Sequence, residues 1–343
     1  MPGNALPGVL ALLCFAALLF SCKAGGGKGA ETSRPLLALS IIPQEWFARR
    51  IAGDFASFLV LAGPGQNPHS YEPSPREMAL LAKADCWILS GTEFEISLAP
   101  KVAAQNPSLK IIDGTRGMRF RLLEEHHDHD EADANPDSDA TASGSNATDS
   151  GSDTAASANA ASGSDTAVSG NTAFDNTAFG AAGRYRHTWL GRDQAIVLAG
   201  HILAALEEID GEHSDTFKKN YQDLVDDINQ VFDELKTKLA PLRGRKVFVY
   251  HPAFGYFLDE FGIIQEAVET GGKEPTPRVL RGLIAEARAE KAAAVFVQAQ
   301  FPAQSAHTVA EAVGARVVSL DPLAPLWLDN IRAMGSALLE AVK

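Results

Sequence analysis

The sequence predicts an α/β protein of two pseudo-symmetric lobes, each with a parallel sheet, joined by one long rigid helix. Short apolar runs typical of buried strands alternate with helical patterns, as in βαβ units. One apolar stripe recurs at steps of three and four from Ser214 to Ala240, enough for about 40 Å of helix. The segments on either side of this stripe repeat the order strand, histidine-containing loop and helix. At 343 residues the chain also exceeds one ordinary core.

The first lobe is expected over residues 35–212. Its predicted strands are residues 36–42, 58–61, 86–89 and 109–112. The second strand leads into a loop rich in glycine, proline and asparagine that presents His69. Ser74 followed by Pro75 is a typical helix start, with serine as the cap and proline as the first helical residue. His69 therefore lies in a strand-to-helix loop at the carboxyl edge of the sheet, where open α/β sheets bind ligands.

His187 is the second candidate ligand of this lobe. It stands just before another helical pattern, with Thr188 as a candidate cap and Trp189 at the start of the apolar face.

The linker helix is expected over residues 213–241 and the second lobe over 242–343. A buried strand at 247–250 ends abruptly at His251, which is either a ligand or a core histidine. We expect the aromatic run Phe254–Phe257 to pack behind this imidazole and keep water from it.

The second lobe also repeats the helix start of the first. Glu-Pro-Thr-Pro at 274–277 mirrors Glu-Pro-Ser-Pro at 72–75, and strands are predicted at 295–297 and 315–320. The last strand stops at Asp321, which places a carboxylate at the carboxyl end of a strand.

An insertion at 124–183 interrupts the first lobe. It has almost no large apolar residue before Phe174, so it cannot bury enough surface to offset its ordering entropy, and we predict disorder. Its first residues include a cluster with the composition of a low-affinity metal-collecting tract, made of His126, His127, Asp128, His129 and Asp130. A solvated linker is the simpler interpretation, and the two are compatible.

The N-terminus predicts export and a lipid anchor. The apolar run Val9–Phe20 has the length of a signal-peptide core and is too short to span a bilayer, so residues 1–21 are expected to be a signal peptide. Leu-Phe-Ser-Cys at 19–22 resembles a bacterial lipobox, which makes Cys22 the lipidation site and 22–34 a flexible tether. A buried helix is the alternative. The mature chain would keep Cys86 alone, which excludes an intramolecular disulfide.

The charge balance argues against nucleic acid as a partner. The chain has 43 acidic and 30 basic residues, which gives a formal net charge of -13. No basic stripe is therefore available to neutralise phosphates. The same balance suits a domain that attracts cations.

Four candidate ligands thus stand at comparable places: His69, His187, His251 and Asp321. Three imidazoles and a carboxylate suit a borderline cation, above all Zn²⁺, whereas Ca²⁺ or Mg²⁺ would require more oxygen ligands.

The sequence resembles the cluster A-I (cluster 9) metal-binding proteins of ABC importers, in particular the zinc-binding members. The resemblance extends from Leu36 to the end of the chain apart from the insertion. It rests on Asn67–Pro75, His187–Leu190, His251–Phe257, Glu274–Pro277 and Leu320–Leu323. The family's metal ligands map onto the same four residues, and a histidine at position 251 is typical of zinc members. Gln298 stands where the family commonly has glutamate, so a hydrogen bond is the role left to it.

The resemblance implies an extracytoplasmic, lipid-anchored or periplasmic monomer that captures Zn²⁺ between its lobes and delivers it to a transmembrane ABC permease. Mn²⁺ or iron is the alternative cargo, and a surface metal buffer or adhesin is the alternative role. A zinc hydrolase is a rival of another class, because three ligands with an open position are also catalytic geometry. Against it, no general base has the spacing of a metalloprotease, and Glu72 is the nearest candidate.

Overall fold

The computed structural model describes residues 34–121, 184–269, 274–298, 300–301 and 304–341. The predicted signal peptide, Cys22, the tether apart from Arg34, and the insertion with its cluster at 126–130 lie outside the described residues. The fold below belongs to the compact unit Pro35–Lys343. The proposed boundaries at 212 and 241 stay a prediction.

The first sheet is parallel and has the strand order β2-β1-β3-β4. Its strands are β1 (Leu36–Ile41), β2 (Ser57–Ala62), β3 (Cys86–Leu89) and β4 (Lys110–Asp113). Its helices are α1 (Ile42–Ala52), α2 (Pro75–Leu81), α3 (Glu93–Gln105) and α5 (Arg192–Ile209). The side chain of Ser74 accepts a hydrogen bond from the Glu77 amide, and Pro75 begins α2, which confirms the predicted helix start.

The second sheet repeats this arrangement with the order β6-β5-β7-β8, also parallel. Its strands are β5 (Lys246–Val249), β6 (Ile264–Ala267), β7 (Ala294–Val297) and β8 (Arg316–Ser319). Its helices are α7 (Gly255–Asp259), α8 (Pro277–Ala289), α9 (Gln304–Val313) and α10 (Trp327–Ala341). Thr276 caps α8 as Ser74 caps α2. The predicted two-lobe α/β fold is confirmed.

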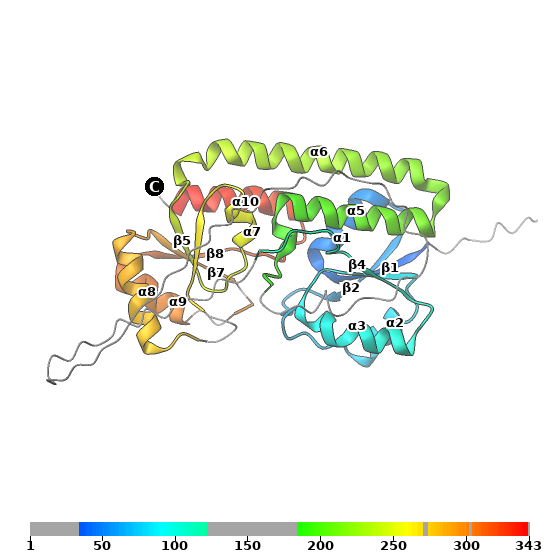
Figure 1. Cartoon of the computed structure of the whole chain (residues 1–343), viewed down its shortest axis with the longest axis horizontal. Coiled ribbons are helices and arrows are strands. Elements are labelled where there is room, and N and C mark those ends of the chain that lie inside the picture. Colours follow the sequence, from blue (N-terminus) through cyan, green and yellow to red (C-terminus); the bar gives the residue numbers. More distant parts are fainter. Residues whose placement is uncertain (1–33, 122–183, 270–273, 299, 302–303, 342–343) are drawn as a thin grey trace, which may run out of the picture. The chain divides into compact units, whose positions relative to one another are not determined.

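The long helix is α6, Ser214–Lys238, and it ends two residues before the predicted Ala240, where a short 3₁₀ turn follows (Ala240–Leu242). It packs against α1 and α5 of the first lobe and α10 of the second (Figure 1). Its apolar stripe is fully buried at Phe217, Leu224, Ile228 and Phe232. One apolar core therefore continues along α6 from the first sheet into the second lobe. No helix of the described part is long and apolar enough to cross a membrane.

One local expectation was wrong, and one strand was not predicted. The helix after His187 begins at Arg192 and not next to Thr188, because a 3₁₀ turn, Thr188–Leu190, comes first. A Cβ on Gly191, between the turn and α5, would lie 3.0 Å from the Cβ of Tyr256, so the second lobe approaches this corner closely. Strand β6 was not predicted, because Gln265 and Glu266 interrupt its apolar pattern.

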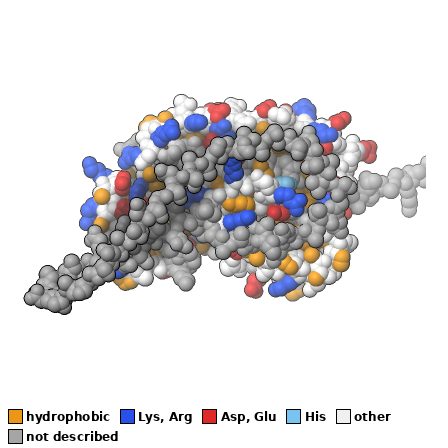
Figure 2. All heavy atoms as spheres, in the orientation of Figure 1, with side chains coloured by type: hydrophobic (Ala, Val, Ile, Leu, Met, Phe, Trp, Pro, Cys, Tyr) orange, Lys and Arg blue, Asp and Glu red, His pale blue; other side chains and the backbone are white. Residues whose placement is uncertain are grey.

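Charged side chains of both signs are visible on one face of the molecule (Figure 2). On the face shown in Figure 2, acidic and basic side chains are interspersed, as on an ordinary solvated surface.

Candidate metal centre

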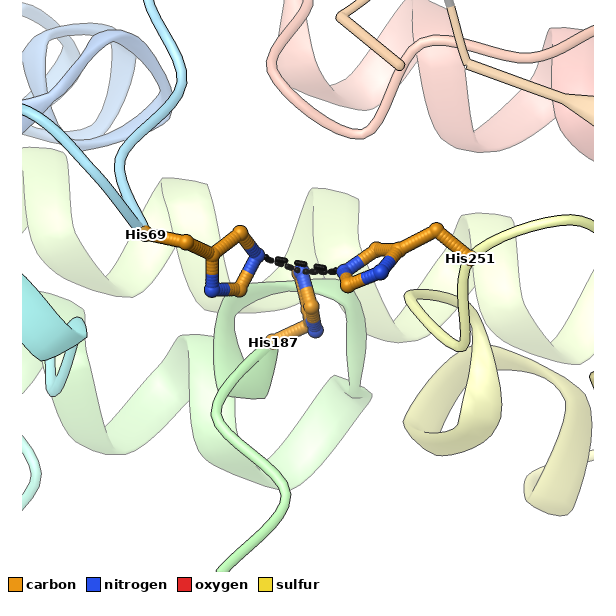
Figure 3. Close-up of side chains that lie close together, drawn as sticks. All are labelled: His69, His187 and His251. Atoms are coloured by element: carbon orange, nitrogen blue, oxygen red, sulfur yellow. Dashed lines mark hydrogen bonds between the residues drawn. The ribbon is translucent and has the colours of Figure 1, made fainter. Parts of the chain in front are cut away.

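Three histidines from distant parts of the chain meet at one point. His69 lies in the loop between β2 and α2, His187 stands before the 3₁₀ turn Thr188–Leu190, and His251 follows β5. Figure 3 shows the three rings turned toward one another. Their Nε2 atoms are 3.2 Å apart for His69 and His187, 3.1 Å for His69 and His251, and 3.3 Å for His187 and His251.

These separations fit a metal ion. Zn–N bonds of 2.0–2.1 Å in tetrahedral geometry place ligand nitrogens about 3.3–3.4 Å apart. Three Nε2 atoms at 3.1–3.3 Å cannot all carry a hydrogen toward the centre, and in the form without such hydrogens their lone pairs converge on one point. Such a cluster of nitrogen lone pairs can bind and stabilise a cation.

Two of the imidazoles are oriented by carboxylates. His69 Nδ1 is 2.7 Å from Glu93 Oε2, and His251 Nδ1 is 3.0 Å from Glu269 Oε1. An ionised carboxylate only accepts hydrogen bonds, so each Nδ1 carries the proton and donates it. Each Nε2 is then left as an acceptor facing the cluster, as in the carboxylate–histidine–metal arrangements of other proteins.

The surroundings of His187 and His251 favour the neutral form of these two imidazoles. Burial, together with the neighbouring His251 and His69, lowers the pKa of His187 well below its usual 6.5. Burial also lowers the pKa of His251, against the opposing effect of the hydrogen bond to Glu269. Burial alone would raise the pKa of Glu93, but the hydrogen bond and charge of His69 outweigh it, and the pKa is lowered. At neutral pH His187 and His251 therefore offer unprotonated nitrogens, the form that binds metals.

His187 is held from both sides by groups of the second lobe. Two residues before it, the Tyr185 hydroxyl donates to Gln265 Oε1 at 3.0 Å and accepts from the Gly255 amide at 2.9 Å. Two residues after it, Trp189 Nε1 donates to the carbonyl of Pro322 at 2.7 Å. The imidazole is thereby fixed relative to His251, although it belongs to the first lobe in sequence.

The chain is similar in sequence and in fold to proteins of zinc uptake. A family model described as the periplasmic zinc-uptake complex component A, ZnuA, matches residues 38–341. The chain belongs to the ZnuA family. The zinc-binding lipoprotein AdcA of Streptococcus pneumoniae is 23% identical over 333 residues, which are 95% of this chain and 56% of AdcA, so the chain spans little more than half of that relative.

Two further relatives carry the ZnuA name. The high-affinity zinc uptake system protein ZnuA of Brucella abortus is 29% identical over 139 residues, 40% of this chain and 42% of that protein. A crystal structure of ZnuA superposes with a TM-score of 0.71 and 26% identity, covering 90% of this chain and 99% of that one. These are uptake and binding proteins and not enzymes, so the hydrolase interpretation is not retained.

Asp321, the fourth residue predicted as a ligand, is placed differently from the histidines of this ZnuA-family site. Among the described residues, the ligand atoms that lie within 4.8 Å of one another belong to the three histidines and do not include its carboxylate. Its Oδ1 accepts hydrogen bonds from the Leu323 amide at 2.9 Å and from Gln300 Nε2 at 3.2 Å.

A small pocket adjoins the histidines on the side of Asp321. It is lined by Pro68, His69, His187, Trp189, Gln300, Phe301, Pro322 and Leu323. Phe301 stacks on His251, with ring centroids 4.2 Å apart and an interplanar angle of 18°. The aromatic cover predicted from Phe254–Phe257 is therefore supplied by Phe301, whereas Tyr256 and Phe257 pack against Tyr185 and Phe232.

Sequence reasoning missed Glu93, Glu269 and Phe301. A signal was present for the two glutamates, since each stands a few residues beyond the carboxyl end of a strand, β3 and β6 respectively. Gln298 does have the hydrogen bond predicted for it. Its Nε2 donates to the backbone carbonyl of His251 at 3.0 Å, which fixes the backbone of this ligand.

Proposed function

We propose that this protein is an extracytoplasmic binding protein that captures Zn²⁺ with the Nε2 atoms of His69, His187 and His251. The observation that carries the proposal is the mutual 3.1–3.3 Å separation of these three atoms. Neutral imidazoles and borderline cations match in softness, which favours Zn²⁺ over Mn²⁺ for this set of donors. Asp321 contributes the negative charge that balances the ion.

The role in transport rests on the family. ZnuA-type relatives are named for zinc uptake, and we propose that this protein likewise delivers its ion to an ABC-type permease, held at the membrane by a lipid on Cys22. The cluster at 126–130 would add weak sites only.

The experiment is a competition titration of the metal-free protein with zinc and manganese against a chromophoric chelator. The wild type should bind one Zn²⁺ tightly and prefer it to Mn²⁺, and His251→Ala should lose the tight site. His307→Ala is the matched control, because His307 is an exposed histidine of α9 in the same lobe. Full zinc affinity in His251→Ala would refute the assignment, and a preference for Mn²⁺ would make manganese the cargo.

A further inference from the structure

Arg186 is the residue directly before His187, and its side chain contacts the first lobe. Its Nη1 donates a hydrogen bond to the carbonyl of Gly91 at 2.9 Å, and its Nε lies 3.7 Å from Glu93 Oε1. The Arg186 side chain is only 10% exposed, so its charge is largely withdrawn from water. The other oxygen of Glu93, Oε2, is 2.7 Å from His69 Nδ1. Arg186, Glu93 and the imidazole of His69 therefore form one continuous series of charged and hydrogen-bonded groups.

Glu93 is the group that holds the His69 ring from outside the histidine cluster. His69 lies in a loop, and in the described part of the chain its ring nitrogens contact Glu93 and the other two histidines. A carboxylate orients an imidazole well only if the carboxylate itself has a fixed position. The position of the His69 ring therefore depends on what fixes Glu93.

Two side chains fix the loop that presents Glu93. The fully buried carboxylate of Glu95 accepts hydrogen bonds from the three backbone amides of residues 90–92, at 2.8, 2.8 and 3.0 Å. Arg186 bonds to the Gly91 carbonyl of the same loop, and its charge also attracts the second oxygen of Glu93. Glu95 thus fixes the backbone of the loop, whereas Arg186 acts on the backbone and on the carboxylate together.

Arg186 also connects this loop to the segment that carries His187. Its neighbours Tyr185 and Trp189 hydrogen-bond to groups of the second lobe. Arg186 bonds instead to Gly91 of the first lobe. The segment is therefore tied to both lobes, and the tie to the first lobe leads through Arg186 to the carboxylate that holds His69.

We propose that Arg186 is a positioning residue for zinc binding, which acts through Glu93 on His69 and holds this ring at its distance from His187 before an ion arrives. Arginine suits this role because its planar fork can bond to the Gly91 carbonyl and face a carboxylate at once, whereas lysine offers a single ammonium group. A site whose ligands are already in place loses less free energy to ordering when it binds. The effect on zinc affinity rests on the proposed function, but the placement of the His69 ring is a property of the metal-free protein.

The test uses Arg186→Lys, Glu93→Ala and the double variant in the full chain. Lysine keeps the positive charge, so a change in affinity does not come from altered repulsion of the ion. Zinc affinity is measured by chelator competition, and the Nδ1–H protons of the histidines are followed by NMR of the metal-free protein with isotope-labelled histidine.

Arg186→Lys should weaken zinc binding about 10-fold, the lower end of the range for groups that support metal ligands. It should shift the Nδ1–H signal of His69 and leave unchanged that of His251, whose Nδ1 faces Glu269. In the Glu93→Ala background, Arg186→Lys should have almost no further effect on affinity, because its path to His69 has been removed.

Each of three results would overturn the proposal: an unchanged His69 signal or zinc affinity in Arg186→Lys, equal shifts of the His69 and His251 signals, and an equal loss of affinity with and without Glu93. Arg116→Lys, at an exposed position of the same lobe, is the control. If Arg186→Lys does not fold, Arg186→Gln keeps a donor for the Gly91 carbonyl without the charge, and the same shift of the His69 signal is expected. Tight zinc binding by the wild type that His251→Ala abolishes would support the three-histidine site even where the Arg186 results fail.

Discussion

Replacement of Glu269 by glutamine tests whether the carboxylate behind His251 contributes to metal affinity. Glu269 is only 3% exposed, and its Oε1 lies 3.0 Å from His251 Nδ1. Glutamine keeps the size of the side chain and an acceptor oxygen but removes the negative charge. The perturbation is therefore electrostatic, and the imidazole loses a charge-assisted hydrogen bond while a neutral one remains.

The expected magnitude follows from the two kinds of hydrogen bond. A hydrogen bond to a charged group contributes about 1.5–3 kcal/mol and a neutral one about 0.5–1.5 kcal/mol. The difference of about 1–1.5 kcal/mol corresponds to roughly a tenfold weaker zinc affinity, at the lower end of the range for such supporting groups. Glu269→Ala should cost more, because it leaves a buried N–H without this acceptor.

The assay is a chelator-competition titration repeated between about pH 5 and 8, the interval in which histidines titrate. Glu269 raises the pKa of His251, so its loss should let His251 stay neutral to lower pH. Glu269→Gln should therefore bind zinc more weakly at neutral pH, and yet its affinity should begin to fall at a lower pH than in the wild type. Glu311→Gln, at an exposed position of α9, is the matched control. An affinity and a pH profile equal to those of the wild type would refute the reasoning.

Two further outcomes are expected. The free energy of unfolding of the metal-free protein should be constant above about pH 6.5 and fall below it, because unfolded His187 takes up a proton near its ordinary pKa while the folded side chain, whose pKa is lowered, does not. Denaturant titrations at several pH values measure this, and His187→Phe should flatten the fall; an identical fall in that variant would exclude His187 as its source. Tyr185→Phe should destabilise the fold by about 1–3 kcal/mol, because it leaves the buried amide of Gly255 without its acceptor. Unfolding in urea measures the loss, and a change no larger than that in Tyr221→Phe, whose ring is only half-buried, would contradict it.

The parts of the fold that could be predicted are those with a local pattern. The stripe along α6 and the two proline-started helices have signals within a few residues, and the structure follows them to within one turn. Strand β6 has no such pattern, because it contains two polar residues and is defined by its pairing with β5. The turn before α5 was missed because Thr188 directly before an apolar pattern looks like a helix cap, and only three residues form the 3₁₀ turn.

In the candidate metal site, too, the residues that could be predicted are those with a local sequence pattern. His69 and His251 could be located because each follows a strand that a local pattern predicts. Their carboxylate partners could not be paired with them, since Glu93 is 24 residues from His69 and Glu269 is 18 residues from His251. These residues come together only because the parallel strands of each sheet end at the same edge.

His187 changes how the two lobes share the site. The chain order assigns it to the first lobe, with His69, and leaves His251 alone in the second. Its neighbours Tyr185 and Trp189 nevertheless hydrogen-bond to Gly255, Gln265 and Pro322 of the second lobe. Two of the three nitrogens are therefore fixed to second-lobe groups, and the first lobe contributes His69 from a loop. A metal ion bonded to all three nitrogens at once would therefore also join that loop to the second lobe, and its binding energy would stabilise this contact.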